Sequence, residues 1–142
     1  MSSTDVVGLG VDIVEVARIR ELMERKGDRL VGRVFTPEEI GCAAGERGGR
    51  YDGLAGRFAA KEAVAKALGT GVRGFGWSEV QIVEEPSGKP RVRLTGRAAE
   101  VAARLGVVHV EVSIAHTRDT AVAVAVALGA GVGGGKLEGR HV

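Results

Sequence analysis

The fold is decided by one alanine-rich stretch near the middle of the chain, Arg57-Phe58-Ala59-Ala60-Lys61-Glu62-Ala63-Val64-Ala65-Lys66-Ala67-Leu68-Gly69. Alanine is the strongest helix former, so these residues predict a long central helix. Gly69-Thr70-Gly71 is a suitable C-terminal stop for that helix. Because most of its side chains are small, other elements would pack close against its remaining faces.

One side of the predicted helix carries Phe58, Glu62 and Lys66 at i, i+4 and i+8, and Arg57 and Lys61 form a second, basic row beside them. A carboxylate flanked by cations suits a divalent metal on Glu62 and phosphate oxygens on the cations. The simpler interpretation is a solvated helix in which Glu62 and Lys66 form an i,i+4 pair worth about 0.2–0.5 kcal/mol. The helix alone leaves both interpretations open.

Residues 6–14 alternate in the manner of a strand. One predicted face is apolar and comprises Leu9, Val11 and Ile13. The other carries Gly8 and Gly10, which would let a second backbone or a ligand approach closely. Asp12 stands at the end of that face, and the pattern Asp12-x-x-Glu15 favours a capping box for a following helix.

The helix after this strand is expected from about Glu15 to Lys26, with a buried stripe of Val16, Ile19, Leu22 and Met23. Its exposed arginines are Arg18, Arg20 and Arg25. The basic segment from Arg18 to Arg33 is either a solvated face or a docking site for an acidic protein. Nucleic-acid binding is not expected, because the net charge is only +2 and aromatic residues make up 4% of the chain.

The remaining elements are predicted from turn and capping residues. Thr36 and Pro37 begin a helix, residues 77–84 and 91–94 form two strands, and Thr95 caps a helix that ends near Leu105. A hairpin follows, with strands at 108–116 and 120–128; one face of the second strand is valine-rich and the other alanine. Glycine-rich residues 45–53 and 71–76 are predicted loops. Residues 1–128 are expected to form one domain, and residues 129–142 a flexible glycine-rich tail.

Composition predicts a soluble globular protein: 142 residues, 44% hydrophobic and 27% charged. No apolar run is long enough to span a membrane, and the N-terminal residues lack a signal-peptide pattern. The single cysteine, Cys42, excludes an internal disulfide and fits a reducing compartment, so we expect a cytoplasmic location. His116 closes an apolar row at a strand end, where a lone histidine is more often structural than functional.

Three stretches together resemble one family. Gly10-Val11-Asp12-Ile13-Val14-Glu15-Val16-Ala17-Arg18-Ile19 is similar to the N-terminal motif of the holo-[acyl-carrier-protein] synthases, and residues 57–69 resemble their central motif. His109-Val110-Glu111-Val112-Ser113-Ile114-Ala115-His116-Thr117 resembles their C-terminal strand. Phe35-Thr36-x-x-Glu39 is a weaker fourth match. The motifs follow the family's order and span roughly residues 6–128.

The resemblance implies a phosphopantetheinyl transferase of α+β fold, in which an antiparallel sheet packs on a long central helix and homotrimers carry active sites between subunits. Such enzymes need Mg²⁺ and move 4′-phosphopantetheine from coenzyme A to a serine of an apo acyl carrier protein, in fatty acid or polyketide (lipid) biosynthesis. The implied catalytic residues are Asp12, Glu62, Lys66 and His116, with Asp12 and Glu62 as the metal ligands. The implied coenzyme A contacts are Arg57, Lys61, Lys66, Gly69, Ser113, His116 and Thr117. Arg18, Arg20 and Arg25 would dock the carrier protein.

The sequence leaves three questions open: the partner of His116, the acceptor of the serine proton and the function itself. Thr117 follows His116 where some relatives have aspartate, so a His-Asp pair is not implied, and the serine proton has three candidate acceptors: a water at the metal, Glu62 or His116. The alternative function is a trimer that binds coenzyme A or a nucleotide and docks acidic proteins without transferring anything.

Overall fold

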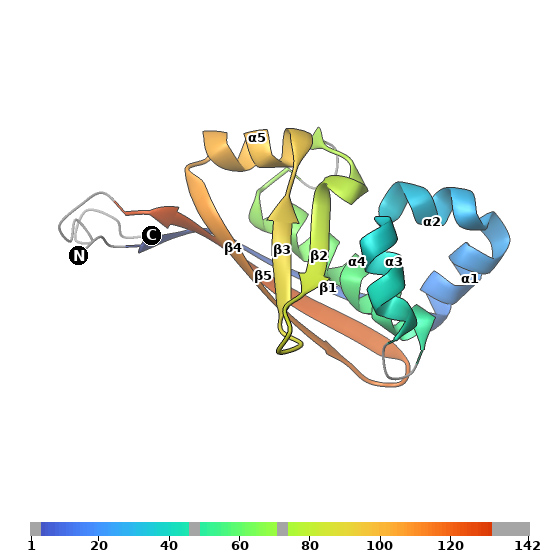
Figure 1. Cartoon of the computed structure of the whole chain (residues 1–142). Coiled ribbons are helices and arrows are strands. Elements are labelled where there is room, and N and C mark those ends of the chain that lie inside the picture. Colours follow the sequence, from blue (N-terminus) through green and yellow to red (C-terminus); the bar gives the residue numbers. More distant parts are fainter. Residues whose placement is uncertain (1–3, 46–48, 71–73, 132–142) are drawn as a thin grey trace.

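The protein is described by a computed structural model that covers residues 4–45, 49–70 and 74–131 (Figure 1). The strands are β1 (Thr4–Glu15), β2 (Val80–Glu84), β3 (Pro90–Leu94), β4 (Val107–His116) and β5 (Thr120–Ala130). The α-helices are α1 (Val16–Lys26), α2 (Asp28–Val34), α3 (Pro37–Ala44), α4 (Arg50–Ala67) and α5 (Gly96–Arg104), and a 3₁₀ turn, η2 (Trp77–Glu79), precedes β2.

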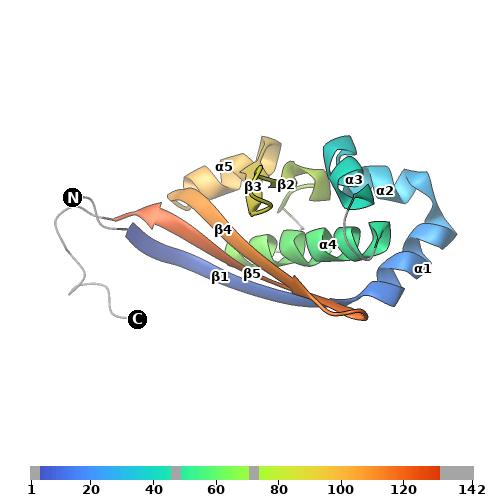
Figure 2. The same cartoon turned by 60° about the horizontal axis from the view of Figure 1, so that its bottom comes forward.

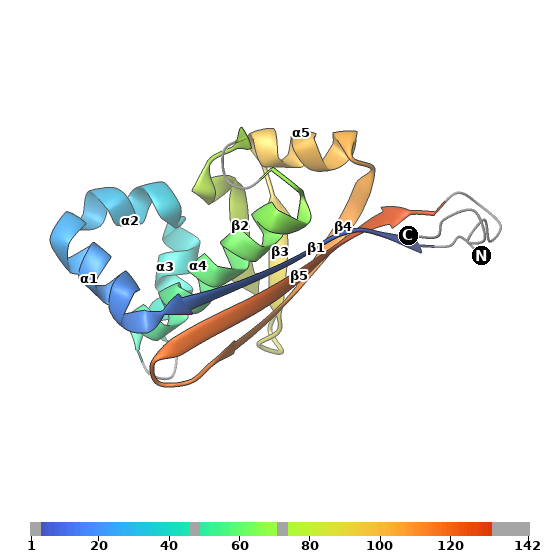
Figure 3. The same ribbon diagram turned by 180° about the vertical axis from the view of Figure 1, so that it is seen from behind.

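Three layers make up the molecule. β1, β5 and β4 form an antiparallel sheet in that order, and β2 and β3 form a separate two-stranded sheet. Figure 2 shows α4 lying along one face of the larger sheet, with α3, β2, β3 and α5 on the far side of α4. Seen from behind, α1 continues directly from the end of β1 (Figure 3). The expected α+β fold with an antiparallel sheet on a long central helix is confirmed.

Small residues bring α4 into close contact with the sheet. The alanines of β5 that face the helix are all buried, namely Ala121, Ala123, Ala125 and Ala127. On β1, a Cβ atom added to Gly10 would lie 1.8 Å from the backbone oxygen of Ala63, and one added to Gly8 would lie 1.9 Å from that of Ala67. The backbones of β1 and α4 therefore touch at positions where only glycine fits, as the sequence predicted.

The opposite face of the sheet is apolar and exposed. The β1 side chains on it are Leu9, Val11 and Ile13, which are 66%, 55% and 68% exposed. Val124 of β5 pairs with Val11 in the same row and is 44% exposed. Among the described residues no helix or strand covers this face (Figure 2). An apolar surface of this extent usually marks an interaction site.

Several predicted boundaries are corrected. α4 begins at Arg50, seven residues before the predicted start, and its first turns include Gly53 and Gly56. β1 continues to Glu15, and α1 begins at Val16 with no side-chain cap, so the prediction that Asp12 caps this helix is wrong. Residues 77–79 form a 3₁₀ turn rather than the start of a strand.

At the C-terminal end, β5 continues through Ala130, so residues 129 and 130 belong to the sheet rather than to the predicted tail. The tail from residue 132 lies outside the described residues, as do residues 46–48 and 71–73 of the two predicted loops. The predicted start of α3 is confirmed: Thr36 and Glu39 form a reciprocal capping box, with Pro37 as the first helical residue. No helix in the described ranges is long and apolar enough to cross a bilayer.

Candidate active site

Asp12 comes together with Glu62 and Lys66, although these residues follow it by 50 and 54 positions in the sequence. The alternation of β1 places Asp12 on the face that meets α4, two residues after Gly10. On α4, Glu62 and Lys66 are one turn apart and point to the same side. The Lys66 ammonium donates to Oδ1 of Asp12 at 3.2 Å and to the backbone oxygen of Val11 at 2.9 Å. The helix and the first strand thus share one charged cluster.

The electrostatics of this cluster centre on Glu62. Burial raises the pKa of the Glu62 carboxyl above its ordinary value, and the negative charge of Asp12 raises it further. The positive charges of Lys66 and Arg18 act in the opposite direction, which places Arg18 of α1 beside the cluster. The Glu62 carboxylate, whose ionised form is disfavoured by burial and by its acidic neighbour, would gain from a divalent cation shared with Asp12.

The donor set also suits a particular kind of metal. In the described part of the chain no group of three or more acidic, histidine or cysteine side chains is placed to bind an ion. Asp12 and Glu62 would therefore supply two oxygen ligands and leave the other positions to water or to substrate. Mg²⁺ is commonly bound in this way, through one or two carboxylates plus phosphate oxygens. The residues present fit that ion.

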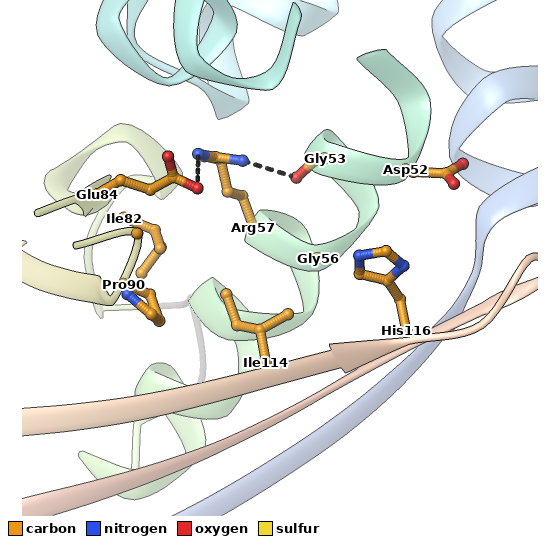
Figure 4. A pocket seen from close by; sticks show the side chains of 10 residues that line it. Asp52, Gly53, Gly56, Arg57, Ile82, Glu84, Pro90, Ile114 and His116 are labelled. Atoms are coloured by element: carbon orange, nitrogen blue, oxygen red, sulfur yellow. Dashed lines mark hydrogen bonds and ion pairs between the residues drawn. The ribbon is translucent and has the colours of Figure 1, made fainter. Parts of the chain in front are cut away.

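Arg57 and His116 lie apart from the carboxylates, in a cavity of about 150 Å³. Figure 4 shows this cavity, which is formed by α4, β2, the β2–β3 turn and β4. The Arg57 side chain is only 4% exposed; one guanidinium nitrogen donates to the backbone oxygen of Gly53 at 3.2 Å, and the other lies 3.7 Å from Glu84. Arginine and histidine side chains both bind anions, so a cavity lined by Arg57 and His116 suits an anionic ligand, with Glu84 as the present partner of Arg57.

The two groups lie on different sides of α4. Arg57 and Glu62 are five residues apart on a helix that turns by about 100° per residue, so their side chains diverge by about 140°. Asp12 is on β1 and His116 on β4, the two edges of the sheet, separated by β5 and therefore by about 10 Å. Neither Asp12 nor Glu62 nor Lys66 lines the Arg57 cavity. The predicted site residues are thus divided within one chain.

Arg57 and Lys61 lie on one side of α4, as predicted, and both are buried against β2. Lys61 is fully buried, and its ammonium donates to Glu39 at 2.9 Å, to the backbone oxygen of Trp77 at 3.0 Å and to that of Val80 at 2.6 Å. These three acceptors use the three protons of the ammonium group. These hydrogen bonds place Lys61 in the interior of the structure, and its contact with a coenzyme A phosphate stays a prediction.

The other predicted ligand contacts lie at different places. Ser113 pairs with Val124 in the row that contains Val11, so it is on the apolar face of the sheet, away from His116. Gly69 follows α4 and has a positive φ of 80°. The Thr117 hydroxyl accepts from the backbone nitrogens of Asp119 and Thr120 and so shapes the β4–β5 turn. In one chain these three residues do not join the Arg57 cavity.

The predicted docking arginines lie on α1. Arg18, Arg20 and Arg25 are all exposed. The Arg20 guanidinium also lies 5.4 Å from the centre of the Tyr51 ring, which connects α1 to the first turn of α4. The basic helix therefore borders the carboxylate cluster through Arg18 and leaves Arg25 near its far end.

Sequence reasoning missed two acidic residues. Glu84 lines the cavity beside Arg57, and Glu39, named above only as part of the weaker fourth motif, is the buried partner of Lys61. The buried partner had one sequence signal: Lys61 lies in the alanine-rich central helix, where a buried charge requires a counter-charge. Glu84 had no such signal, because it is the last residue of an ordinary predicted strand.

Comparison with known proteins identifies the family. Residues 8–127 match the model of the 4′-phosphopantetheinyl transferase superfamily. A holo-[acyl-carrier-protein] synthase of Desulforudis audaxviator is 52% identical over 117 residues, covering 82% of this chain and 88% of that protein. The corresponding protein of Chloroflexus aurantiacus is 48% identical over 125 residues, covering 80% of this chain and 91% of that protein.

Solved structures of holo-[acyl-carrier-protein] synthases support the same family assignment. The crystal structure of holo-[acyl-carrier-protein] synthase from Neisseria meningitidis superposes with a TM-score of 0.78 at 36% identity, covering 87% of this chain and 98% of that chain. The Helicobacter pylori enzyme, solved in complex with coenzyme A, gives a TM-score of 0.74 at 29% identity, covering 84% of this chain and 98% of that chain. The resemblance seen in the three motifs is confirmed, and the chain belongs to the 4′-phosphopantetheinyl transferase superfamily.

Proposed function

We propose that this chain is a holo-[acyl-carrier-protein] synthase: it transfers 4′-phosphopantetheine from coenzyme A to a serine of apo acyl carrier protein and releases adenosine 3′,5′-bisphosphate. Relatives at 41–52% identity over most of the chain carry that name. The observation that carries the proposal is the meeting of Asp12, Glu62 and Lys66 across β1 and α4. Two carboxylates and a lysine on one surface suit a pyrophosphate substrate with its metal.

The mechanism follows from the charges of the substrate. In this transfer the serine oxygen attacks the β-phosphorus of coenzyme A, the bond from that phosphorus to the bridging oxygen breaks, and the nucleotide leaves with that oxygen. The serine proton passes to a base, for which Glu62 and His116 are the candidates on this chain. The reaction depends mainly on positioning and charge neutralisation. Asp12 and Glu62 would hold Mg²⁺, which when bound supplies positive charge to the pyrophosphate. Lys66 is half exposed and long enough to move from Asp12 to a phosphate oxygen. Arg57 and His116 would hold the phosphates of the nucleotide portion.

We further propose a homotrimer with active sites shared between neighbouring subunits. The exposed apolar face of the sheet, centred on Leu9, Val11 and Ile13, supports association. The Asp12–Glu62 cluster and the Arg57 cavity lie on different sides of α4. This separation within one chain supports active sites that combine residues of two neighbouring subunits. In a cyclic arrangement the cavity of one subunit can face the carboxylates of the next. Ser113, on the apolar face, would then lie near the interface.

Carrier-protein recognition is assigned to α1. Its exposed arginines, Arg18, Arg20 and Arg25, present positive charge next to the carboxylate cluster. An acidic helix of the carrier protein would be steered to this surface, and Arg18 would place its serine close to Glu62. The cytoplasm is the proposed location, in keeping with a single cysteine and a coenzyme A substrate.

The test is an intact-mass measurement. Purified protein is incubated with coenzyme A, Mg²⁺ and an apo acyl carrier protein, with EDTA in a parallel sample. A carrier that gains the mass of one phosphopantetheine only in the sample without EDTA supports both the transfer and its metal requirement. Tight coenzyme A binding with no mass gain on any carrier would instead favour the non-catalytic binding trimer.

A further inference from the structure

The side of α4 that faces away from the large sheet carries two buried cations. Arg57 and Lys61 are one turn apart, 4% and 0% exposed, and both point toward β2. Arg57 lines the cavity assigned to coenzyme A, whereas Lys61 does not touch it. Lys61 therefore needs an explanation other than ligand binding.

Lys61 and Glu39 form a completely hydrogen-bonded buried pair. Both side chains are 0% exposed, and the ammonium lies 2.9 Å from Oε1 of Glu39. The same Glu39 oxygen accepts from the backbone nitrogen of Thr36 at 2.9 Å, and Oε2 accepts from that of Ile82 at 2.8 Å. One pair thus joins α3, α4 and β2.

Stability alone is a poor reason for such a pair. Burying two charges is costly, and well-packed apolar side chains of similar volume often give equal or greater stability. Hydrogen bonds are directional, whereas apolar contacts are not. The backbone N–H of Ile82 and the backbone oxygen of Val80 fix the register of β2 relative to α3 and α4. A shift of β2 by one residue would present the wrong backbone groups to Lys61 and Glu39.

The β2–β3 hairpin depends on this fixation. It is not hydrogen-bonded to the three-stranded sheet, and a two-stranded hairpin is marginally stable by itself. Yet the hairpin supplies one wall of the Arg57 cavity, through Ile82 and Glu84 of β2 and Pro90 of β3. Ile82 is both a partner of Glu39 and a cavity residue. A displaced hairpin would therefore change the cavity first.

We infer that Lys61 and Glu39 are positioning residues for the coenzyme A pocket: they hold the β2–β3 hairpin against α4 and thereby set the width of the cavity between Arg57 and Ile82. The inference rests on the proposed function only in assigning coenzyme A to that cavity. It predicts that loss of the pair weakens coenzyme A binding while leaving carrier-protein recognition by α1 intact.

The test is the double variant Glu39→Leu/Lys61→Met, which replaces the pair by apolar side chains of similar length. By calorimetric titration, its dissociation constant for coenzyme A should rise about tenfold or more, the usual effect of removing the support of a binding site. Its KM for carrier protein and its kcat at saturating coenzyme A should stay near wild type. Val110→Ala, a core truncation on β4 outside the cavity, controls for general destabilisation and should bind coenzyme A normally.

Each outcome decides the matter. A folded double variant with the wild-type dissociation constant overturns the inference, as does an equal weakening in Val110→Ala. If the double variant does not fold, Glu39→Gln, which keeps the volume of the side chain, replaces it under the same criteria. The wild-type transfer assay is independent: wild-type protein that binds coenzyme A but never modifies a carrier would refute the proposed function and leave the positioning role to be judged by binding alone.

Discussion

Lys66 and Asp12 form an ion pair at the point where a metal would be needed, with the ammonium nitrogen 3.2 Å from Oδ1 of Asp12. The Asp12 side chain is 19% exposed and that of Lys66 is 52% exposed, so the lysine covers the carboxylate from the solvent side. An ammonium group and a divalent cation compete for the same oxygen. Coenzyme A would relieve this competition, because its phosphates offer Lys66 another anionic partner.

We therefore expect Lys66→Met to bind a divalent cation more tightly than wild type when coenzyme A is absent. An exposed ion pair is worth about 0.2–1 kcal/mol, so the gain should be about 1.4- to fivefold. Paramagnetic Mn²⁺, measured by the loss of its free signal, is a suitable probe. Lys89→Met is the matched control, since Lys89 is 56% exposed and lies 3.7 Å from Glu111. Unchanged Mn²⁺ affinity in Lys66→Met would exclude competition.

Glu62→Gln should lower the transfer rate by about 10²–10³ and, unusually for a site variant, raise the melting temperature of the metal-free protein. The folded-state pKa of Glu62 is raised, so stability is greatest below the unfolded pKa and declines as pH rises toward the folded pKa. The variant should thus melt higher than wild type at pH 7 and equally near pH 4. A lower melting temperature at pH 7 would contradict this. Mg²⁺ should stabilise wild type more than the variant.

The apolar face predicts how the protein assembles. Ile13→Lys places a charge where a neighbouring subunit would bury the 68% exposed isoleucine, so the variant should sediment as a monomer. Leu105→Lys is the control, because Leu105 is an exposed leucine just beyond α5, outside the sheet. Wild-type protein that already sediments as a monomer at micromolar concentration would exclude the trimer.

Shared active sites predict complementation between inactive subunits. Arg57→Ala and Glu62→Gln alone should each reduce transfer to about 1% of the wild-type rate or less. After co-refolding in equal amounts, about one site in four should combine an intact cavity with an intact carboxylate cluster, restoring about a quarter of wild-type activity. No recovery in verified mixed trimers would mean that each site is built from a single subunit.

Carrier docking on α1 is tested by charge reversal at its far end. Arg25→Glu should raise the KM for carrier protein and leave the KM for coenzyme A unchanged, because Arg25 is exposed and near the end of the helix remote from β1. The effect should shrink as salt is added. Arg104→Glu on α5 reverses a comparable charge outside the docking surface. Equal effects of both variants on the two substrates would remove the assignment.

Much of this architecture was predictable, because the deciding residues act locally. The alanines of residues 59–67 and the alternation of residues 120–128 specify the helix and the strand that pack together. Gly8 and Gly10 signalled a close contact that the structure shows. The start of α4 was missed because Gly53 and Gly56 are poor helix formers; a Cβ atom at Gly56 would lie 3.0 Å from Ile114, so tertiary packing favours glycine there.

The errors concern partners that are distant in sequence. Asp12-x-x-Glu15 is a favourable capping pattern when only local sequence is considered. In the structure Glu15 pairs with Thr120, so β1 extends past Asp12, and the Asp12 carboxylate accepts a hydrogen bond from Lys66 instead. Helical spacing shows that Arg57 and Lys61 share a side, but it does not reveal that β2 and α3 cover that side. Glu39, 22 residues before Lys61, becomes its partner only once α3 is in place.

The contact between Gly10 and Ala63 has a consequence for the precision of the site. Asp12 is two residues beyond Gly10 on the same face, and Glu62 immediately precedes Ala63. The separation of the Asp12 and Glu62 Cα atoms is therefore fixed by direct contact between the two main chains, and only the rotamers of the two acidic side chains still change the distance between their carboxylates. Core substitutions on the hairpin side of α4 should leave that separation unaltered, so the metal ligands and the nucleotide pocket are free to vary independently during evolution.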